Sequence, residues 1–250
     1  MLLATRRLFG MAPVPAMHLR TRTDGFTLVE VAIVLVIMGL LLGSLLKGQE
    51  LLTNARVREL IAQQDSIKAA FFGFQDRFRA FPGDYSQAIG AVIGATQNGN
   101  GNARIESGAT PNESTLAWEH MSRAGFLNAT FTYAATESVS TSPRNNYGVF
   151  LQVVYDGIYG AGTAATPAPV RHNIKSGSQV PVGVIAEVDR KIDDGAPNGG
   201  GFQFSRYQGS SSSAPTDGTT AAPACTSATG AGGTWNATNG STNCGGASLL

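Results

Sequence analysis

Apolar residues change their spacing near residue 47, and this change predicts one long helix with two different halves. Residues 31–46 are uncharged and nearly all apolar, and with residues 26–30 they form a run of 21 residues that a single acid, Glu30, interrupts. A helix of that length rises about 31 Å, enough to cross the hydrocarbon core of a bilayer. Beyond Lys47 the apolar residues recur at helical spacing on one face only. That stripe comprises Val57, Leu60, Ile67, Phe71, Phe74, Phe78 and Phe81, with Gln64 as its polar member.

The helix is expected to run from near Phe26 to about Ala80, because Pro82-Gly83 stops helices and starts turns. Its first half suits a membrane, and its second half suits packing against a folded head. The expected fold class is therefore α+β, with the long N-terminal helix packed on a small C-terminal head.

Shorter elements with an antiparallel sheet are predicted in that head, where the chain becomes rich in glycine. The segment Thr110-Pro111-Asn112-Glu113 supplies a cap, a first-turn proline and a capping-box glutamate for a helix that continues to about Ala124. Aromatic and β-branched runs predict strands, and helical spacing of apolar residues predicts a further helix. These elements are a strand over 147–155, a helix over 182–192 and a strand over 202–207.

Composition and charge exclude several functions. Charged residues make up 14% of the chain and the net charge is +1, so no nucleic acid partner is expected. Two cysteines and three histidines are too few for a zinc framework. His120 and His172 have no evident nucleophile beside them in the sequence, and surface positions are expected for both. We therefore expect neither an enzyme nor a bound cofactor.

The segment before the apolar run is basic. It contains Arg6, Arg7, Arg20 and Arg22 with a single acid, Asp24. The positive-inside rule then places this end in the cytoplasm and the remainder of the chain outside it. A cleaved secretory signal or a plain signal anchor would share this pattern. The length of the apolar run and the carboxylate of Glu30 disfavour the cleaved secretory signal.

The segment Gly25-Phe26-Thr27-Leu28-Val29-Glu30 resembles the type III signal of the type IV pilin and type II secretion pseudopilin superfamily. The resemblance is strong over about residues 21–81. It is weaker in the head, where residues 81–85 (FPGDY) and 191–195 (KIDDG) look like phrases of uncharacterised pilin-like proteins. A leader of 25 residues is long for this family, so Met17 is an alternative start.

The resemblance implies a processing and assembly route. Prepilin peptidase would cleave between Gly25 and Phe26 and methylate the new N-terminus at Phe26. Glu30 would pair with the N-terminal amine of a neighbouring subunit, because a carboxylate in hydrocarbon is costly unless it is paired. Gly39 and Gly43 form a GxxxG motif that allows close approach of helices, and incidental glycines are the alternative. The implied partners are the peptidase, other pilin or pseudopilin subunits, and the lipid of the inner membrane.

Two features of the C-terminal half carry further expectations. Cys225 and Cys244 resemble the C-terminal disulfide loop of many pilins, and a disulfide is expected between them. Asp189, Asp193 and Asp194 offer negative charge near the end of a predicted helix. Solvation of the helix end is the preferred interpretation of this charge, and Ca²⁺ binding is the alternative.

The combined hypothesis is a minor pilin or pseudopilin with its helix in the inner membrane and its head in the periplasm, later assembled into a filament. A membrane-anchored periplasmic binding or sensory domain that never polymerises is the alternative. The sequence does not distinguish a pilus from a secretion pseudopilus or a competence filament. The expected regions are a leader (1–25), a membrane and assembly helix (26–46), an amphipathic helix (47–81), a globular head (82–207) and a Gly/Ser/Thr-rich region with the disulfide loop (208–250).

Overall fold

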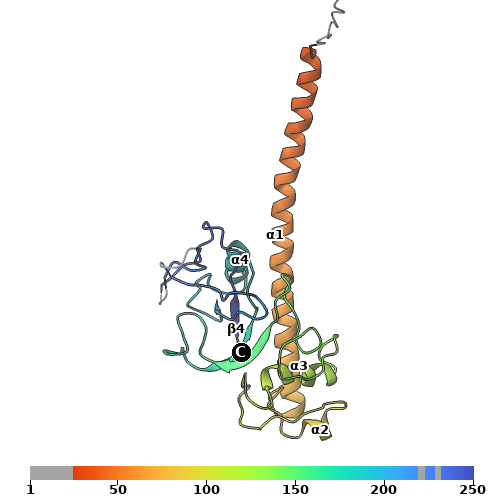
Figure 1. The fold of residues 1–250 in the computed structure, drawn as a ribbon, viewed down its shortest axis with the longest axis vertical. Helices are drawn as coiled ribbons and strands as arrows, with labels where there is room; N and C mark the ends of the chain where they lie inside the picture. The colour runs from red at the N-terminus through yellow and green to blue at the C-terminus, as the bar shows by residue number, and fades with distance from the viewer. Residues whose placement is uncertain (1–24, 219–222, 229–231) are drawn as a thin grey trace, which may run out of the picture. The chain divides into compact units, whose positions relative to one another are not determined.

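A computed structural model describes residues 25–218, 223–228 and 232–250 of the chain. The leader, apart from Gly25, and the alternative start at Met17 lie outside the described residues. Contacts divide the chain into two units, the first ending at Lys47 and the second running from Gly48 to Leu250. The elements, labelled in Figure 1 where space allows, are α1 (Leu28–Phe78), α2 (Ala88–Ala91), α3 (Glu113–Arg123), β1 (Gln152–Asp156), β2 (Arg171–Lys175), α4 (Val182–Ile192), β3 (Phe202–Phe204) and β4 (Gly246–Leu249).

Helix α1 confirms the predicted long helix. At its start, the hydroxyl oxygen of Thr27 accepts a hydrogen bond from the backbone N–H of Glu30 at 3.2 Å, which satisfies one of the free donors of the first turn. At its end, Arg79 has a φ of 53°, in the left-handed region that commonly terminates helices. Pro82 then prevents the helix from continuing.

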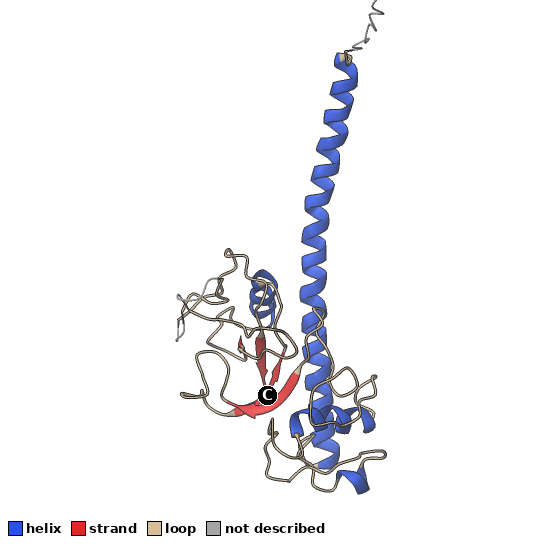
Figure 2. Cartoon of the chain, in the orientation of Figure 1, coloured by secondary structure: helices blue, strands red, loops and turns tan. Residues whose placement is uncertain are grey.

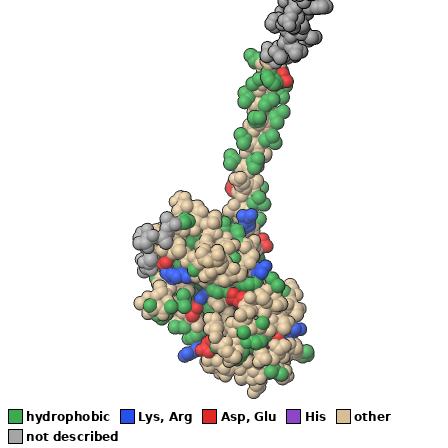
Figure 3. Space-filling view, in the orientation of Figure 1, with side chains coloured by type: hydrophobic (Ala, Val, Ile, Leu, Met, Phe, Trp, Pro, Cys, Tyr) green, Lys and Arg blue, Asp and Glu red, His purple; other side chains and the backbone are tan. Residues whose placement is uncertain are grey.

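In the first unit, the large apolar side chains of α1 are exposed along the whole segment, and Figure 3 shows them on the face in view. Among the described residues, α1 is the one helix that is long and apolar enough to cross a membrane, and none of its most apolar window is buried by the rest of the chain. Exposure of so much apolar surface to water is unfavourable, and lipid or other helices would remove it.

The second half of α1 belongs to the head and buries one stripe of side chains. Two buried clusters among the described residues meet this stripe. Around Val57 and Leu60 it packs with α4 and β3, and around Ile67 and Phe74 it packs with α3, β1 and β2. The buried residues of α1 are Val57, Leu60, Gln64, Ile67, Ala70, Phe71 and Phe74, and all but Ala70 lie in the predicted stripe.

The strands that the structure describes form an antiparallel sheet in the order β1-β2-β4-β3 (Figure 2). Val153 of β1 lies opposite Ile174 of β2, and both side chains join the cluster around Ile67. Strand β4, at the C-terminus of the chain, lies between β2 and β3. The α+β class with a long N-terminal helix and an antiparallel sheet is thereby confirmed.

The predicted strand over residues 147–155 is wrong in its first half. Only Gln152–Asp156 forms β1. Before it, the side-chain carbonyl of Asn145 accepts hydrogen bonds from the N–H groups of Tyr147 and Val149 at 2.9 and 3.0 Å, which folds this segment into a turn. The strand predicted over 202–207 likewise ends early, at Phe204.

The start of α3 also differs from the prediction. The helix begins at Glu113, and its N-cap residue Asn112 makes no side-chain capping bond. Glu113 is fully buried, and its carboxylate accepts hydrogen bonds from the backbone N–H groups of Asn100 (2.9 Å) and Glu106 (3.1 Å). The glutamate therefore satisfies amides of a neighbouring loop instead of closing a capping box, because those buried donors need an acceptor.

Candidate functional site

The predicted processing site lies directly before α1. Gly25 and Phe26 are not helical, and the side chain of Phe26 is 81% exposed. Thr27 caps the helix at the next position. A peptide bond in an exposed, non-helical segment is open to a peptidase, which favours cleavage at this position.

Glu30 lies in the first turn of α1 among exposed apolar residues. Within the part of the chain that the structure describes, its carboxylate has no ion-pair partner. A carboxylate in the first turn is favoured by the positive end of the helix dipole, an effect of about 0.3–1 kcal/mol. That is small beside the cost of burying an unpaired charge, so in an apolar layer Glu30 would need a cation that the described residues do not supply.

Gly39 and Gly43 face open space in the described part of the chain. A Cβ atom added at either position meets no atom within 4 Å. The chain's own packing therefore does not require glycine at these positions. Glycine at these positions would allow close approach by another helix.

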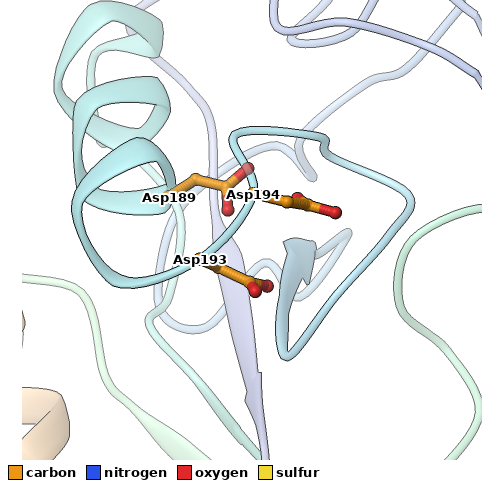
Figure 4. Close-up of side chains that lie close together, drawn as sticks. All are labelled: Asp189, Asp193 and Asp194. Carbon is orange, nitrogen blue, oxygen red and sulfur yellow. The ribbon is translucent and has the colours of Figure 1, made fainter.

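Three aspartates converge at the end of α4, as Figure 4 shows. Asp189 lies in the last turn of the helix, and Asp193 and Asp194 follow directly after it. One carboxylate oxygen from each lies within 4.8 Å of the others. These are the described residues that could hold a metal ion.

The interpretation of this group as a solvated helix end is wrong for Asp189, which is fully buried. Its Oδ2 accepts a hydrogen bond from the indole N–H of Trp235 at 2.6 Å. Burial raises the pKa of Asp189 to about 6, and the charges of Asp194 and Asp193 add to the shift against the effect of the Trp235 hydrogen bond. Packing of the C-terminal region against α4, which the local sequence does not reveal, removes this carboxylate from water.

The expected disulfide is present between Cys225 and Cys244, whose Cα atoms are 5.6 Å apart. Both cysteines are buried in the cluster that contains α4 and Trp235. The disulfide loop is therefore packed into the head, and its tryptophan connects it to the aspartates.

The expectation of surface histidines is wrong for His120, which is fully buried on α3. Burial lowers its pKa, against the opposing effects of the Gln97 carbonyl and of Glu119. His172 is half-buried beside Phe81, with ring centroids 4.2 Å apart, and burial lowers its pKa to about 4. The aromatic packing that covers both rings comes from residues far away in the sequence.

Sequence reasoning missed two participants in these sites. Thr27 caps α1, and the spacing Thr27-x-x-Glu30 is a capping-box signal that could have identified it. Trp235 binds Asp189, and no local pattern links residues so far apart.

Residues 20–46 match the family described as Prokaryotic N-terminal methylation motif. The chain therefore carries the prepilin-type signal that is the hallmark of type IV pilins and pseudopilins, which confirms the resemblance. This signal implies processing by prepilin peptidase and assembly with other pilin subunits, and it indicates a structural role. With the apolar half of α1 it fits an inner-membrane anchor. No curated protein and no solved structure matches the chain.

Proposed function

We propose that the protein is a structural subunit, a minor pilin or pseudopilin, of a type IV pilus or a type II secretion pseudopilus. Prepilin peptidase cleaves it between Gly25 and Phe26 and methylates Phe26. The first half of α1 holds the protein in the inner membrane with its head in the periplasm, and the same helix later packs in a filament. Removal of 25 residues from 250 leaves 225, which suits a minor subunit better than a major one.

One observation carries this proposal: the methylation motif at residues 20–46 overlaps the start of a helix whose apolar surface the described residues leave uncovered. The hydrocarbon core of a lipid bilayer can cover about 20 apolar residues of such a helix. Exposed apolar residues continue beyond that span, since Leu51 and Leu52 in the head unit are 66% and 62% exposed. Packing of neighbouring subunits would cover them, whereas a monomeric anchor would leave them in water.

Processing is the direct test. Membrane-extracted protein should give an intact mass and an N-terminal sequence that begin at Phe26 with one added methyl group. Gly25→Leu should leave the leader attached, because a bulky side chain does not fit a subsite that takes glycine. Gly48→Leu is the matched control, because an added Cβ atom at Gly48 also meets no atom within 4 Å and the position lies outside the motif. A mature chain that retains residues before Phe26, or that begins after Ser44, contradicts the proposal.

Polymerisation separates this proposal from the monomeric alternative. In cells that express the processed protein, crosslinking should join it to itself or to other pilin-like proteins through α1. A periplasmic binding or sensory domain on a membrane anchor would be found only as a monomer. Normal processing without any crosslinked species would therefore favour that alternative.

A further inference from the structure

A cavity of about 430 Å³ lies at the C-terminal end of α1, within the size range of small-ligand sites. The FPGDY segment of the sequence, residues 81–85, supplies one wall. The last turn of α1 supplies a second wall, and the loop around Gly101 and Ala103 supplies a third. All of these residues belong to the head unit, so one folded body forms the whole cavity.

Asp84 holds the third wall in position. It is buried, and its Oδ1 and Oδ2 accept hydrogen bonds from the N–H groups of Asn102 and Ala103, both at 2.9 Å. The described part of the chain has three non-glycine residues with a left-handed φ, and two of them, Arg79 and Ala103, line this cavity. Strained backbone of this kind concentrates at ligand sites. Hydrogen bonds to Asp84 therefore keep the wall in one shape without a ligand.

Three aromatic side chains, Phe78, Phe81 and Tyr85, line the cavity, and each is only partly buried. The ring centroids of Phe78 and Tyr85 are 5.7 Å apart. Packing fixes the rings, since Phe74 lies 4.5 Å from Phe78 and His172 lies 4.2 Å from Phe81, measured between ring centroids. The exposed parts of the three rings therefore give the cavity a rigid apolar surface.

Polar side chains with unused hydrogen-bonding groups surround these rings. In the part of the chain that the structure describes, four side chains that line the cavity make no hydrogen bond: Gln75, Tyr85, Ser86 and Gln87. Each glutamine amide offers both N–H donors and a carbonyl acceptor, and each hydroxyl can donate and accept. A ligand in the cavity would therefore meet donors and acceptors beside an apolar surface.

The charged side chains of the cavity are already occupied. Both carboxylate oxygens of Asp84 accept from backbone amides. Arg79 forms an ion pair with Asp76, with 3.5 Å between Nη1 and Oδ1. The cavity therefore offers no unpaired charge to attract an ionic ligand, and a neutral ligand fits it better.

We propose that this cavity binds a neutral carbohydrate, a mono- or disaccharide unit. One face of a sugar ring carries C–H groups and suits the aromatic surface of Phe78, Phe81 and Tyr85. The hydroxyl groups at the edge of the ring both donate and accept, which suits the free amides of Gln75 and Gln87. Carbohydrate binding would give the head a recognition role in addition to the structural role of the helix, and it does not depend on filament assembly.

The test is saturation-transfer NMR on the full chain, solubilised in a detergent without a sugar head group. Maltose, lactose, cellobiose and diacetylchitobiose are the probes, each at millimolar concentration. At least one of them should receive saturation from the protein, most strongly at the C–H protons of the ring face that meets the aromatic side chains. Triglycine, a neutral peptide, is the comparison ligand and should receive none.

Gln75→Ala and Gln87→Ala decide the assignment. Neither glutamine side chain makes a hydrogen bond within the described structure, so both variants should keep the fold. Each should weaken binding of the disaccharide about three- to tenfold, the effect of one lost hydrogen bond. Gln152→Ala is the matched control, because Gln152 is half-buried like Gln75 and lies on β1 outside the cavity. Its affinity should equal that of the unmodified chain.

Tyr85→Leu tests the aromatic surface, because it keeps an apolar side chain and removes one ring. Saturation transfer to the disaccharide should be lost in this variant. Tyr85 also packs against Phe74, with ring centroids 6.3 Å apart, so the melting temperature of the variant is measured as well. If that temperature falls below the temperature of the binding experiment, the two glutamine variants decide alone.

The inference is overturned if none of the four disaccharides receives saturation from the unmodified chain, or if triglycine binds in their place. Equal affinity in Gln75→Ala, Gln87→Ala and the unmodified chain would also overturn it. Processing and crosslinking are measured separately, so a failure of sugar binding would leave the structural role unaffected.

Discussion

The backbone N–H of Gly83 donates a hydrogen bond to Nδ1 of His120 at 3.0 Å, which ties the turn after α1 to the last turn of α3. The other ring nitrogen, Nε2, lies 3.1 Å from the carbonyl oxygen of Gln97. A carbonyl can only accept and a backbone amide can only donate, so this neutral ring carries its proton on Nε2. Protonation of Nδ1 would place a second donor against Gly83, which adds to the effect of burial in keeping the ring neutral.

His120 should make the head less stable in mild acid. Its pKa in the folded state lies below the ordinary value of 6.5, so the unfolded chain binds the proton more readily. The free energy of unfolding should be highest above pH 6.5 and fall as the pH is lowered, by up to about 1.4 kcal/mol per pH unit for this group. Denaturation at pH 7, 6 and 5 should show a smaller fall for His120→Asn, whose side-chain carbonyl can still accept from Gly83.

His172 acts in the same direction, with a folded pKa of about 4, so His172→Asn is the comparison variant. Buried carboxylates whose pKa burial raises, such as Asp84 and Glu113, oppose the trend, because the folded chain binds their protons more readily than the unfolded chain does. The free energy of unfolding changes with pH at a different slope in the unmodified chain and in each variant. That difference gives the contribution of the replaced histidine. If the free energy of unfolding of His120→Asn fell with pH as steeply as that of the unmodified chain, His120 would not contribute to the acid sensitivity.

Gly83 should tolerate no side chain. Its φ is +87°, and an added Cβ atom would lie 2.3 Å from the carbonyl oxygen of Glu113. Left-handed strain and overpacking together should cost Gly83→Ala about 2 kcal/mol or more in the free energy of unfolding. Gly90→Ala, whose added Cβ meets nothing within 4 Å, is the matched control and should be neutral or slightly stabilising. Equal urea midpoints for both variants would show that the turn relaxes.

Lys175 and Asp156 form an ion pair on the sheet, with the lysine side chain only 4% exposed. Asp156→Asn should lower the free energy of unfolding by about 3–5 kcal/mol, because it leaves a buried ammonium without its partner. The double variant Asp156→Asn with Lys175→Met should be more stable than this single variant, because it removes both charges. Urea denaturation of the two singles and the double gives the coupling between the residues. A double variant less stable than Asp156→Asn would contradict the prediction that the unpaired ammonium of Lys175 is costly.

The disulfide should stabilise the C-terminal region. Replacement of Cys225 and Cys244 by serine should lower the free energy of unfolding by about 3 kcal/mol, the entropy of a loop of this length. Proteolysis should then cut the region around Trp235 first, while the helical signal in circular dichroism stays constant. Chain purified without reductant should contain no free thiol. A stoichiometric yield of alkylated cysteine from such protein would refute the bond.

Glu30 should be required for assembly and dispensable for folding. If it pairs with the amine of Phe26 on a neighbour, Glu30→Ala should cost about 3–5 kcal/mol at each subunit contact by analogy with broken buried pairs. Crosslinks and recovered filaments should then be lost, while cleavage at Gly25 and the circular dichroism of the head remain unchanged. Glu30→Asp, which keeps the charge, should retain part of the assembly. Filaments of Glu30→Ala as abundant as those of the unmodified chain would contradict the role.

The sequence alone determined the features that depend on nearby residues. The length and apolar run of α1, its buried stripe from Val57 to Phe74 and its end before Pro82 all follow from spacing along one helix. The bounds of α4 follow from Pro181 and the apolar spacing after it. The methylation motif is likewise a contiguous signal, and its position required no tertiary information.

Tertiary structure alone decided the features that depend on distant residues. Strands β2 and β4 read as RHNIK and GASL, which carry little strand signal, and they form because the central positions of the sheet pair their backbones. Glu113 does not close the predicted capping box, because its carboxylate accepts hydrogen bonds from the amides of Asn100 and Glu106 in the loop before the helix. Asp189 became a buried carboxylate because Trp235, 46 residues further along the chain, packs over it. Burial and hydrogen bonding between distant segments set the chemistry of each of these groups, and no local pattern encodes them.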